Sequence, residues 1–542
     1  MKRVLAGLGT TLLTASVVTV LAPAQHAVAA TLSVPGQYRT ISAAIAAAHN
    51  GDTILVSPGT YRENITISGK NLVLRTVSGP DKTIIAGNPG RSPVMFQHVG
   101  PSTVIRGFRI VSGNAPSGQG GGITVANGAS PVIAYNKILS NRSNDGGGIL
   151  VYNQSNPDIA YNYIENNTAS QFGGGVFAYI GSNPVLHDNV ISGNRATGGG
   201  GIYLESNSGN RAARAGGKVV RNTITGNIAA EAGGGIMMRT GEVAQIDFNV
   251  ISGNRAPYGG GIEVETNGSG PSIVGNQIKY NTAATSSAYP GSGSGGGIAV
   301  YGQSTPLIQG NTVYGNRSSI YGGGIVLAEG SNSRVVGNNI AANVVVNTTP
   351  GVGGGGLFGA NSDCSIWNNV FRANSARGGG GLSFSGTGNW VILNNTIVSN
   401  RATGGGTGAL GGGLFVGGKT TGKTSVVNNI FADNNNFQIF DSGRLSSYAN
   451  NLADINDLGP FYSYATNKLT ALSQLNGRYF YGSGNVDGNS AFVNGPGANY
   501  MLTAGSNAVD HGRAAGAPGN DYRGARRPYG RGYDIGAYEY TG

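Results

Sequence analysis

Short runs of alternating apolar and polar residues repeat along most of this chain at a regular interval. Residues 189–205 show one unit, NVISGNRATGGGGIYLE: an Asn, four residues, a second Asn, a short gap, a glycine run and an alternating strand. Self-similarity at a period between roughly 20 and 50 residues is typical of a solenoid, and strand-type alternation inside each unit makes it a β-solenoid. The paired asparagines recur at Asn136/Asn141, Asn162/Asn167, Asn222/Asn227, Asn249/Asn254, Asn276/Asn281, Asn311/Asn316, Asn338/Asn343, Asn369/Asn374, Asn395/Asn400 and Asn429/Asn434.

Each unit predicts one coil of three strands. In the coil that begins near residue 131, we expect strands at 131–133, 137–139 and 146–152. Asn136 would turn the first corner and Asn141 would open a loop before the third strand. Asparagine suits such corners because it tolerates left-handed backbone and its amide can bond to neighbouring coils. Glycine before the third strand permits positive φ and a close approach of neighbouring backbones.

The two ends of the chain depart from the repeat. Residues 1–30 carry Lys2 and Arg3, an apolar core and a small-residue end, the plan of a secretory signal peptide. Residues 38–52 show helical spacing with Thr40 as a candidate N-cap, which predicts a helix that caps the first coil. We therefore divide the chain into a signal peptide (1–30), a cap region (31–52), β-helix coils (53–436) and a C-terminal end or capping region (437–542).

Composition adds constraints on environment and partners. The formal net charge is +11, and it falls to +9 when Lys2 and Arg3 are removed with the signal peptide, which leaves a basic exported protein. Cys364 is the only cysteine, so the chain has no internal disulfide, and we expect this thiol to be buried and inert. No second apolar stretch has the length of a membrane span.

Two terminal blocks resemble known proteins. Residues 59–63, Gly-Thr-Tyr-Arg-Glu, with the strands around them, resemble the opening of pectinesterases and other pectin-lyase-like proteins. That resemblance implies an all-β fold, a right-handed parallel β-helix with three sheets and a short N-terminal capping helix. The catalytic motifs of pectinesterases are absent, so esterase chemistry is not implied. The end of the chain, including 521–524 and 534–539, resembles the C-terminal region of bacterial exported β-helix proteins. We expect its acids and arginines mainly to form a charged network that closes the last coil.

Charged residues gather on one predicted strand row. If the aliphatic residue after each glycine run points inward, the residues one and three positions later point outward. The third position carries Glu205, Arg239 and Glu265 in successive coils, although charged residues make up only 11% of the chain. Glu263 lies in the row beside them. Four other outward positions of these two rows carry tyrosines: Tyr152, Tyr179, Tyr203 and Tyr301.

This row favours the cleavage of a polysaccharide. Glu205 and Glu265 would have backbones roughly 9.6 Å apart, close to the spacing of the acid and base of an inverting glycosidase. Arg239 would orient an acidic sugar, and the tyrosines and Glu263 would line sugar-binding subsites. Two intervals between glycine runs, 202–236 and 262–298, are longer than most, and their extra residues, with Arg211 and Arg214, would wall a cleft.

Two further interpretations stay open from the sequence. Glu205, Glu263 and Glu265 could hold Ca²⁺ in a polysaccharide lyase, with Arg239 or a tyrosine as base. A salt-bridge ladder without catalysis would make the protein a cell-surface or glycan-binding solenoid. We expect a secreted carbohydrate-active enzyme, with hydrolysis favoured, no cofactor or metal unless it is a lyase, and a polysaccharide partner. We expect no nucleic acid partner, no membrane insertion after signal removal, and a monomer.

Overall fold

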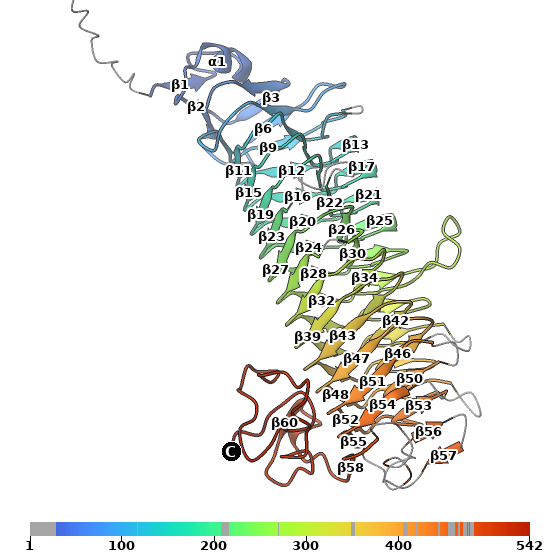
Figure 1. Cartoon of the computed structure of the whole chain (residues 1–542). Coiled ribbons are helices and arrows are strands. Elements are labelled where there is room, and N and C mark those ends of the chain that lie inside the picture. The colour runs from blue at the N-terminus through green and yellow to red at the C-terminus, as the bar shows by residue number, and fades with distance from the viewer. Residues whose placement is uncertain are drawn as a thin grey trace, which may run out of the picture.

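The computed structural model describes residues 29–115, 118–206, 216–268, 270–347, 353–404, 410–417, 421–442, 445–453, 461–463, 467–469, 474, 476 and 482–542. Over these residues the chain winds into a long solenoid of stacked coils (Figure 1). Three sheets of 16 strands each run along it, as the repeat predicts. Sheet A runs from β1 (Thr31–Val34) to β54 (Leu445–Ala449), sheet B from β3 (Gly59–Arg62) to β58 (Val486–Asp487), and sheet C from β4 (Ile65–Ser68) to β57 (Asn467–Leu469).

A fourth sheet corrects the prediction of three strands per coil. One coil contains β15 (Asp158–Ala160) in sheet A, β16 (Tyr163–Glu165) in sheet B, β17 (Thr168–Phe172) in the extra sheet D and β18 (Val176–Ala178) in sheet C. The strand in sheet D is formed by the gap between the second Asn and the glycine run, where we expected a loop. The ten strands of sheet D in the described residues are β13 (Arg142–Asp145), β17, β21 (Arg195–Gly198), β25 (Ile228–Ala232), β29 (Arg255–Ala256), β33 (Thr282–Ala283), β37 (Arg317–Ser318), β41 (Val344–Val345), β45 (Ser375–Ala376) and β49 (Arg401–Ala402).

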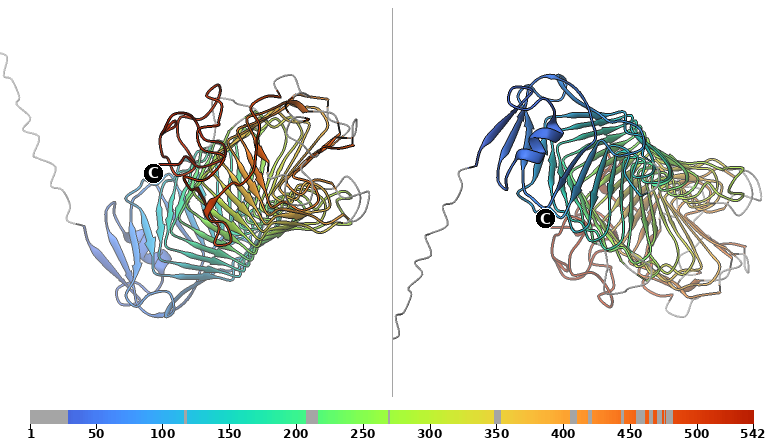
Figure 2. Two further views of the ribbon diagram at one scale, coloured as in Figure 1. Left: turned by 90° about the horizontal axis from the view of Figure 1, so that it is seen from below. Right: turned by 90° about the horizontal axis from the view of Figure 1, so that it is seen from above.

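Stacked aliphatic side chains fill the interior of the coils. The central residue of each short strand in sheets A and B points inward, as Ile159 and Ile164 do with no exposed surface. Figure 2 shows the coils stacked behind one another along the solenoid. Because each coil presents the same aliphatic positions to its neighbours, the core is continuous along the described coils.

The asparagine pairs form two buried ladders at the corners, as predicted. Asn227 is fully buried, and its backbone N–H donates to Asn254 Oδ1 of the next coil at 2.9 Å. Its side-chain amide donates to the carbonyl of Ile191 at 2.9 Å and to Asn254 Oδ1 at 3.0 Å. Each amide thus satisfies backbone groups that would otherwise be buried without partners at the corner.

The glycine runs lie where neighbouring coils touch. A Cβ on Gly147 would lie 2.5 Å from the carbonyl oxygen of Gly174 in the next coil, a separation too short for any other residue. Gly146 has φ of +61°, which glycine adopts without the steric cost of a Cβ. The runs are therefore scaffold, as the sequence predicts.

The N-terminal cap agrees with the prediction in position and in its cap residue. Helix α1 (Ile41–Ala47) begins after Thr40, whose side chain accepts a hydrogen bond from the backbone N–H of Ala43. The carboxylate of Glu63 accepts from the backbone N–H groups of Ile41 and Ser42, both at 2.8 Å. The helix lies at the N-terminal end of the solenoid (Figures 1 and 2) and buries Ile41 there.

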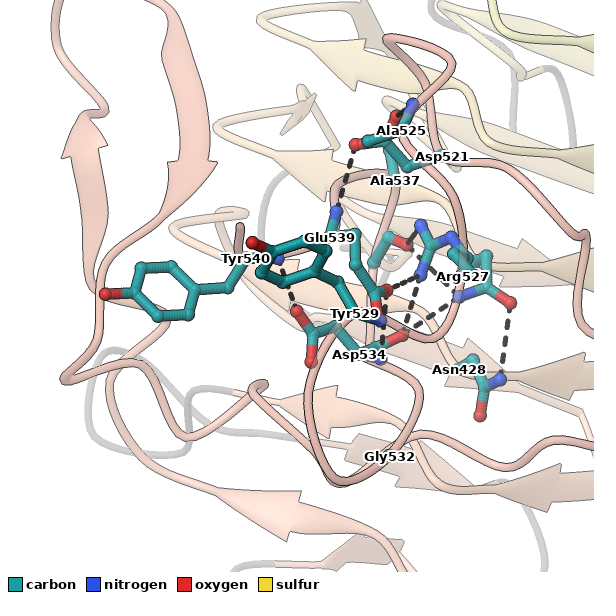
Figure 3. Close-up of polar contacts among 12 residues, drawn as sticks. Asn428, Asp521, Ala525, Arg527, Tyr529, Gly532, Asp534, Ala537, Glu539 and Tyr540 are labelled. Atoms are coloured by element: carbon teal, nitrogen blue, oxygen red, sulfur yellow. Dashed lines mark hydrogen bonds and ion pairs between the residues drawn. The ribbon is translucent and has the colours of Figure 1, made fainter. Parts of the chain in front are cut away.

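The C-terminal region differs from the expected closing network. The sheets continue beyond residue 436, through β53 (Ile439–Asp441) as far as β58. The remaining tail then returns along the side of the solenoid (Figure 1), where it packs on the outer face of sheet B and on the adjoining corner between sheets A and B. A charged network does form there: the Arg527 guanidinium contacts Glu539 Oε2 at 3.0 Å, and both side chains are buried (Figure 3). The network holds the tail against the flank of the coils.

Candidate active site

The predicted charged row lies on three neighbouring strands of sheet C: β22 (Ile202–Glu205), β26 (Ile236–Arg239) and β30 (Ile262–Glu265). The register pairs Glu205 with Arg239 and Arg239 with Glu265. All three residues are half-buried. The sequence therefore predicts their adjacency correctly.

The second row, one position after the aliphatic residue that follows each glycine run, is not exposed as we expected. Tyr203 is 1%, Met237 0% and Glu263 2% exposed, because sheet D lies over the outer face of sheet C and covers them. The residues of sheet D that face inward are small, for example Ala229 and Ala256, so this sheet packs closely. The expected sugar-binding roles of Tyr203 and Glu263 at an open surface do not hold.

A cavity of about 170 Å³ opens at the edge of this layer. Four glutamates, an arginine and two tyrosines contribute to it. They come from β25, β26 and β30 and from the segments that follow or precede neighbouring strands. The lining residues are Glu231, Ala232, Arg239, Tyr258, Glu263, Glu265, Tyr301 and Glu329. This acid cavity is the candidate active site.

Arg239 holds two of these carboxylates. Its Nε donates to Glu265 Oε2 at 2.9 Å, and its Nη2 donates to Glu231 Oε1 at 3.1 Å. Burial lowers the pKa of Arg239, but the nearby carboxylates of Glu265 and Glu263 outweigh burial and raise the pKa above its ordinary value. Arg239 is therefore a fixed positive charge that already pairs with the protein's own acids.

Glu263 is the most unusual group in the acid cavity. Its side chain is 2% exposed, and its Oε2 has no hydrogen-bond partner among the described residues. Burial, followed by repulsion from the carboxylate of Glu265, raises the pKa of Glu263 well above 4.5. Both effects favour the protonated form of the Glu263 carboxyl group, and one of its oxygens is uncommitted.

One of the two long intervals does contribute to this region. Tyr289, in the segment between β33 and β34 (Ile298–Val300), donates its hydroxyl to Glu231 Oε2 at 3.4 Å. The other long interval contains Arg211 and Arg214, which lie outside the described residues. This segment therefore reaches the region of the charged row through Tyr289, which does not itself line the cavity.

The remaining predicted residues divide between the acid cavity and a neighbouring aromatic cluster. Tyr301 lines the cavity, and its ring meets that of Tyr258 edge to face at 5.9 Å between centroids. Tyr152 and Tyr179 stack at 5.7 Å and pack with Phe177 between sheets C and D. Glu205 is on the same row but is not part of the cavity lining.

Glu205 interacts chiefly with its own coil. Burial raises its pKa above 4.5, and a hydrogen bond from Tyr203 partly offsets the increase. Tyr203 itself packs edge to face on Phe177 at 5.0 Å between ring centroids. Glu205 therefore lies beside the acid cavity rather than within it.

Glu231, Tyr258 and Glu329 line the cavity but were missed from the sequence. Glu231 and Tyr258 precede glycine runs, in the gap that we interpreted as a loop. Glu329 follows the outer-row position Ala328. A strand assignment for the gap would have placed Glu231 and Tyr258 opposite the charged row.

Metal and membrane features are limited in the described ranges. No group of three or more His, Cys, Asp or Glu side chains there is arranged to hold a metal ion. Across the same residues, none of the helices is long and apolar enough to cross a membrane.

The predicted signal peptide lies almost wholly within residues 1–28, outside the described residues. Cys364 is buried as predicted, and burial raises the pKa of its thiol to about 11.

The sequence matches the family model of the right-handed β-helix region over residues 95–214 and 211–377, more than half of the chain. The protein therefore belongs to the right-handed β-helix family, as the three long parallel sheets also indicate. No curated protein matches the sequence.

Among solved structures, the chain is similar to the catalytic unit of a thermostable GH87 α-1,3-glucanase from Streptomyces thermodiastaticus. The two are 15% identical with a TM-score of 0.36, over 71% of this chain and 63% of that one. This chain thus spans less than two thirds of that unit. It is also similar to pectate lyase Pel9A, with 14% identity, a TM-score of 0.24, and coverage of 92% of this chain and 90% of that one. A third similar structure is the PL6 family alginate lyase AlyGC, at 12% identity and a TM-score of 0.15, over 80% of this chain and 93% of that one. Likenesses this weak carry no argument about activity.

Proposed function

We propose that the protein hydrolyses glycosidic bonds of a polysaccharide at the acid cavity. The observation that carries this proposal is the environment of Glu263: a buried carboxyl group with an uncommitted oxygen, in a cavity shared with other glutamates, where burial favours the protonated form. Glycosidases need two carboxyl groups whose environments differ, one that donates a proton and one that accepts it. The acid cavity contains two carboxyl groups that differ in this way, since Glu263 is buried and Glu329 is exposed.

Glu263 is the proposed general acid. It would give its proton to the glycosidic oxygen as the bond from that oxygen to the anomeric carbon breaks. Glu329 is the proposed base, since it is the exposed glutamate of the cavity and follows β38 (Ile325–Leu327), two coils beyond Glu263. It would take a proton from the water that attacks the anomeric carbon, and this chemistry inverts the configuration.

Glu263 and Glu329 line the same cavity, although their backbones are not directly stacked. The register aligns Glu263 with Ala299 and Ala299 with Val326, so Glu329 is two coils beyond Glu263 and three residues further along, and the backbones are roughly 14 Å apart. Because both side chains line one cavity, their carboxyl groups are closer together than their backbones. Inverting enzymes hold their carboxyl groups about 6.5 to 9.5 Å apart, which leaves room for a water molecule. Glu231 and Glu265 would hold Arg239 in position, and its positive charge would offset the repulsion between the carboxylates.

The charge of the acid cavity changes the expected substrate. Four glutamates and one arginine line it, and Arg239 is already paired with Glu231 and Glu265. A uronate would meet more negative than positive charge there. We therefore expect a neutral or amino sugar at the cleavage point, not the acidic sugar that the sequence suggested.

Elimination is less well supported. Burial raises the pKa of Tyr203 and of Tyr301 above the ordinary tyrosine value of 10.0, and the carboxylates beside Arg239 keep its guanidinium charged. None of these side chains is suited to removing a proton from a sugar at neutral pH. The expected export of the chain fits an enzyme that meets its polysaccharide outside the cell.

The test is a glycan panel followed both by reducing ends and by the absorbance of unsaturated uronates. We expect reducing ends without unsaturation, and a loss of at least about 100-fold in rate for Glu263→Gln and for Glu329→Gln. Glu165→Gln, on the outer face of sheet B, is the matched control and should keep full activity. Unsaturated products would indicate a lyase. Binding of glycans without cleavage would indicate a binding solenoid, and a fully active Glu263→Gln enzyme would exclude the proposed acid.

A further inference from the structure

The corner between sheets A and B has a second feature besides its asparagine ladder. The residue just before the first Asn of each pair adopts a left-handed conformation, with φ between 52° and 67° in eleven coils from Tyr135 to Asn428. Asparagine and glycine accept this conformation readily, whereas larger residues do so at a cost of about 1 kcal/mol or more. The residue type at this corner position divides the edge into three zones.

The first zone carries large or charged side chains, and the last carries asparagines. In the first zone Phe248 is 62% exposed. In the last zone the side-chain amides bind the returning tail: Asn368 donates to the carbonyl of Asn520 at 2.6 Å and Asn428 to that of Arg513 at 2.8 Å (Figure 3 shows Asn428 beside the network). The corner positions of the first zone are Tyr135, Tyr161, Asp188, Arg221 and Phe248.

The middle zone has only glycine at the corner position: Gly275, Gly310 and Gly337. A Cβ on Gly310 or Gly337 would meet nothing within 4 Å, so crowding does not require glycine there. Asparagine adopts the same conformation at Asn368, one coil beyond Gly337, so backbone strain does not require glycine either. The effect of these glycines is to leave space.

That space is a cleft of about 600 Å³ between the corner and the tail. Gly310 and Gly337 form part of its floor, and residues 518–524 of the tail form its wall. Trp367, a half-buried aromatic residue, and Asn368 lie at one end. Further along the same corner, beyond the residues that line this cavity, the ring of Phe248 lies against Gly275, where an added Cβ would be 2.6 Å from the ring. We name this region, from Phe248 to Asn368 and the tail wall, the corner cleft.

The corner cleft has the chemistry of a sugar-binding surface. Aromatic rings at its two ends offer apolar faces on which the C–H face of a sugar can pack. Asn368 is 5% exposed, and its buried Oδ1 has no hydrogen-bond partner among the described residues. Gln309 adds an exposed amide to the lining. The charge of Arg523 in the wall lies 3.8 Å from Asp521, so the lining has no net charge.

We propose that the corner cleft binds a neutral oligosaccharide, independently of the acid cavity. The binding surface crosses five neighbouring coils, a span of roughly 19 Å, which fits several sugar rings. The two sites lie on different sides of each coil, one beside sheets C and D and the other at the corner between sheets A and B. A polysaccharide held in the corner cleft would keep the enzyme on its substrate between cleavage events.

The test fills the corner cleft with a residue that the chain itself uses at this position. The double variant Gly310→Asn/Gly337→Asn places amides where the cavity is open, in a conformation that Asn368 and Asn394 already adopt. Gly226→Asn is the matched control: Gly226 has φ of +63° and open space around it, but it lies at the corner between sheets B and D. All variants carry Glu263→Gln to prevent cleavage, and melting temperatures verify the fold.

Binding is measured by isothermal titration with cellohexaose, laminarihexaose, maltohexaose and chitohexaose. We expect at least one of these to bind, with affinity about tenfold or more weaker in the double variant and in Trp367→Ala, and unchanged in Gly226→Asn. The proposal is overturned if none of the four binds the parent protein. It is equally overturned if the double variant binds as the parent does, because the ligand then lies elsewhere, or if Gly226→Asn weakens binding to the same extent.

Discussion

Glu242 should make the stability of this protein fall as the pH rises. The side chain is 1% exposed, and its Oε1 has no hydrogen-bond partner among the described residues. Burial raises its pKa from 4.5 to about 8, although backbone N–H groups such as that of Gly217 oppose the change. Between these two pH values the folded protein holds a proton that the unfolded chain has released.

The sign and size follow from this difference. A carboxyl group with a raised folded-state pKa contributes no penalty below pH 4.5, where both states are protonated, and a growing penalty from there to pH 8. The slope is about 1.4 kcal/mol per pH unit for one group, so the full window costs about 5 kcal/mol. Glutamine has a similar shape and does not titrate. Glu242→Gln should therefore become more stable than the wild type, step by step, as the pH increases.

The assay is urea unfolding of both proteins at several pH values between 4 and 8.5, followed by circular dichroism. The informative quantity is the difference between the two free energies of unfolding at each pH, because other titrating groups cancel in it. We expect this difference to change in favour of Glu242→Gln by several kcal/mol across the window. A difference that stays constant with pH would refute the reasoning, since it would mean that burial does not raise the pKa of Glu242.

Two further predictions concern the scaffold. Asn254→Ala removes the acceptor of the Asn227 backbone N–H and the donor to the Ile224 carbonyl, and should lower the free energy of unfolding by about 3–5 kcal/mol in urea titrations. The control Asn332→Ala, at an exposed position, should change the free energy of unfolding by less than about 0.5 kcal/mol. Equal effects of the two substitutions would contradict the role of the ladder. Arg527→Met leaves the Glu539 carboxylate buried without its ion pair, and should weaken tail docking by about 3–5 kcal/mol and expose the tail to limited proteolysis, whereas the exposed Arg531→Met should not. An Arg527→Met protein whose tail resists protease like the wild type would show that the ion pair does not hold the tail.

Much of the fold follows from local patterns in the sequence. The period, the two asparagine ladders, the glycine contacts and the cap residue Thr40 can each be identified from residues close together in the chain. The adjacency of Glu205, Arg239 and Glu265 also follows, because a parallel solenoid places equivalent positions of successive coils side by side. The sequence by itself thus determined the family and the row on which charges meet.

The acid cavity depended on the tertiary structure. Sheet D has no apolar alternation to reveal it, since its inward residues are small and its hydrogen bonds come only from the coils before and after. That sheet buries Glu263, raises its pKa and places Glu231 opposite Arg239. The return of the tail along the corner between sheets A and B likewise depends on contacts between residues more than 80 positions apart, such as Asn428 with Arg513. Burial and long-range contact are properties of the packed molecule. For that reason the sequence located the charged row, whereas only the structure decided which of its acids is buried.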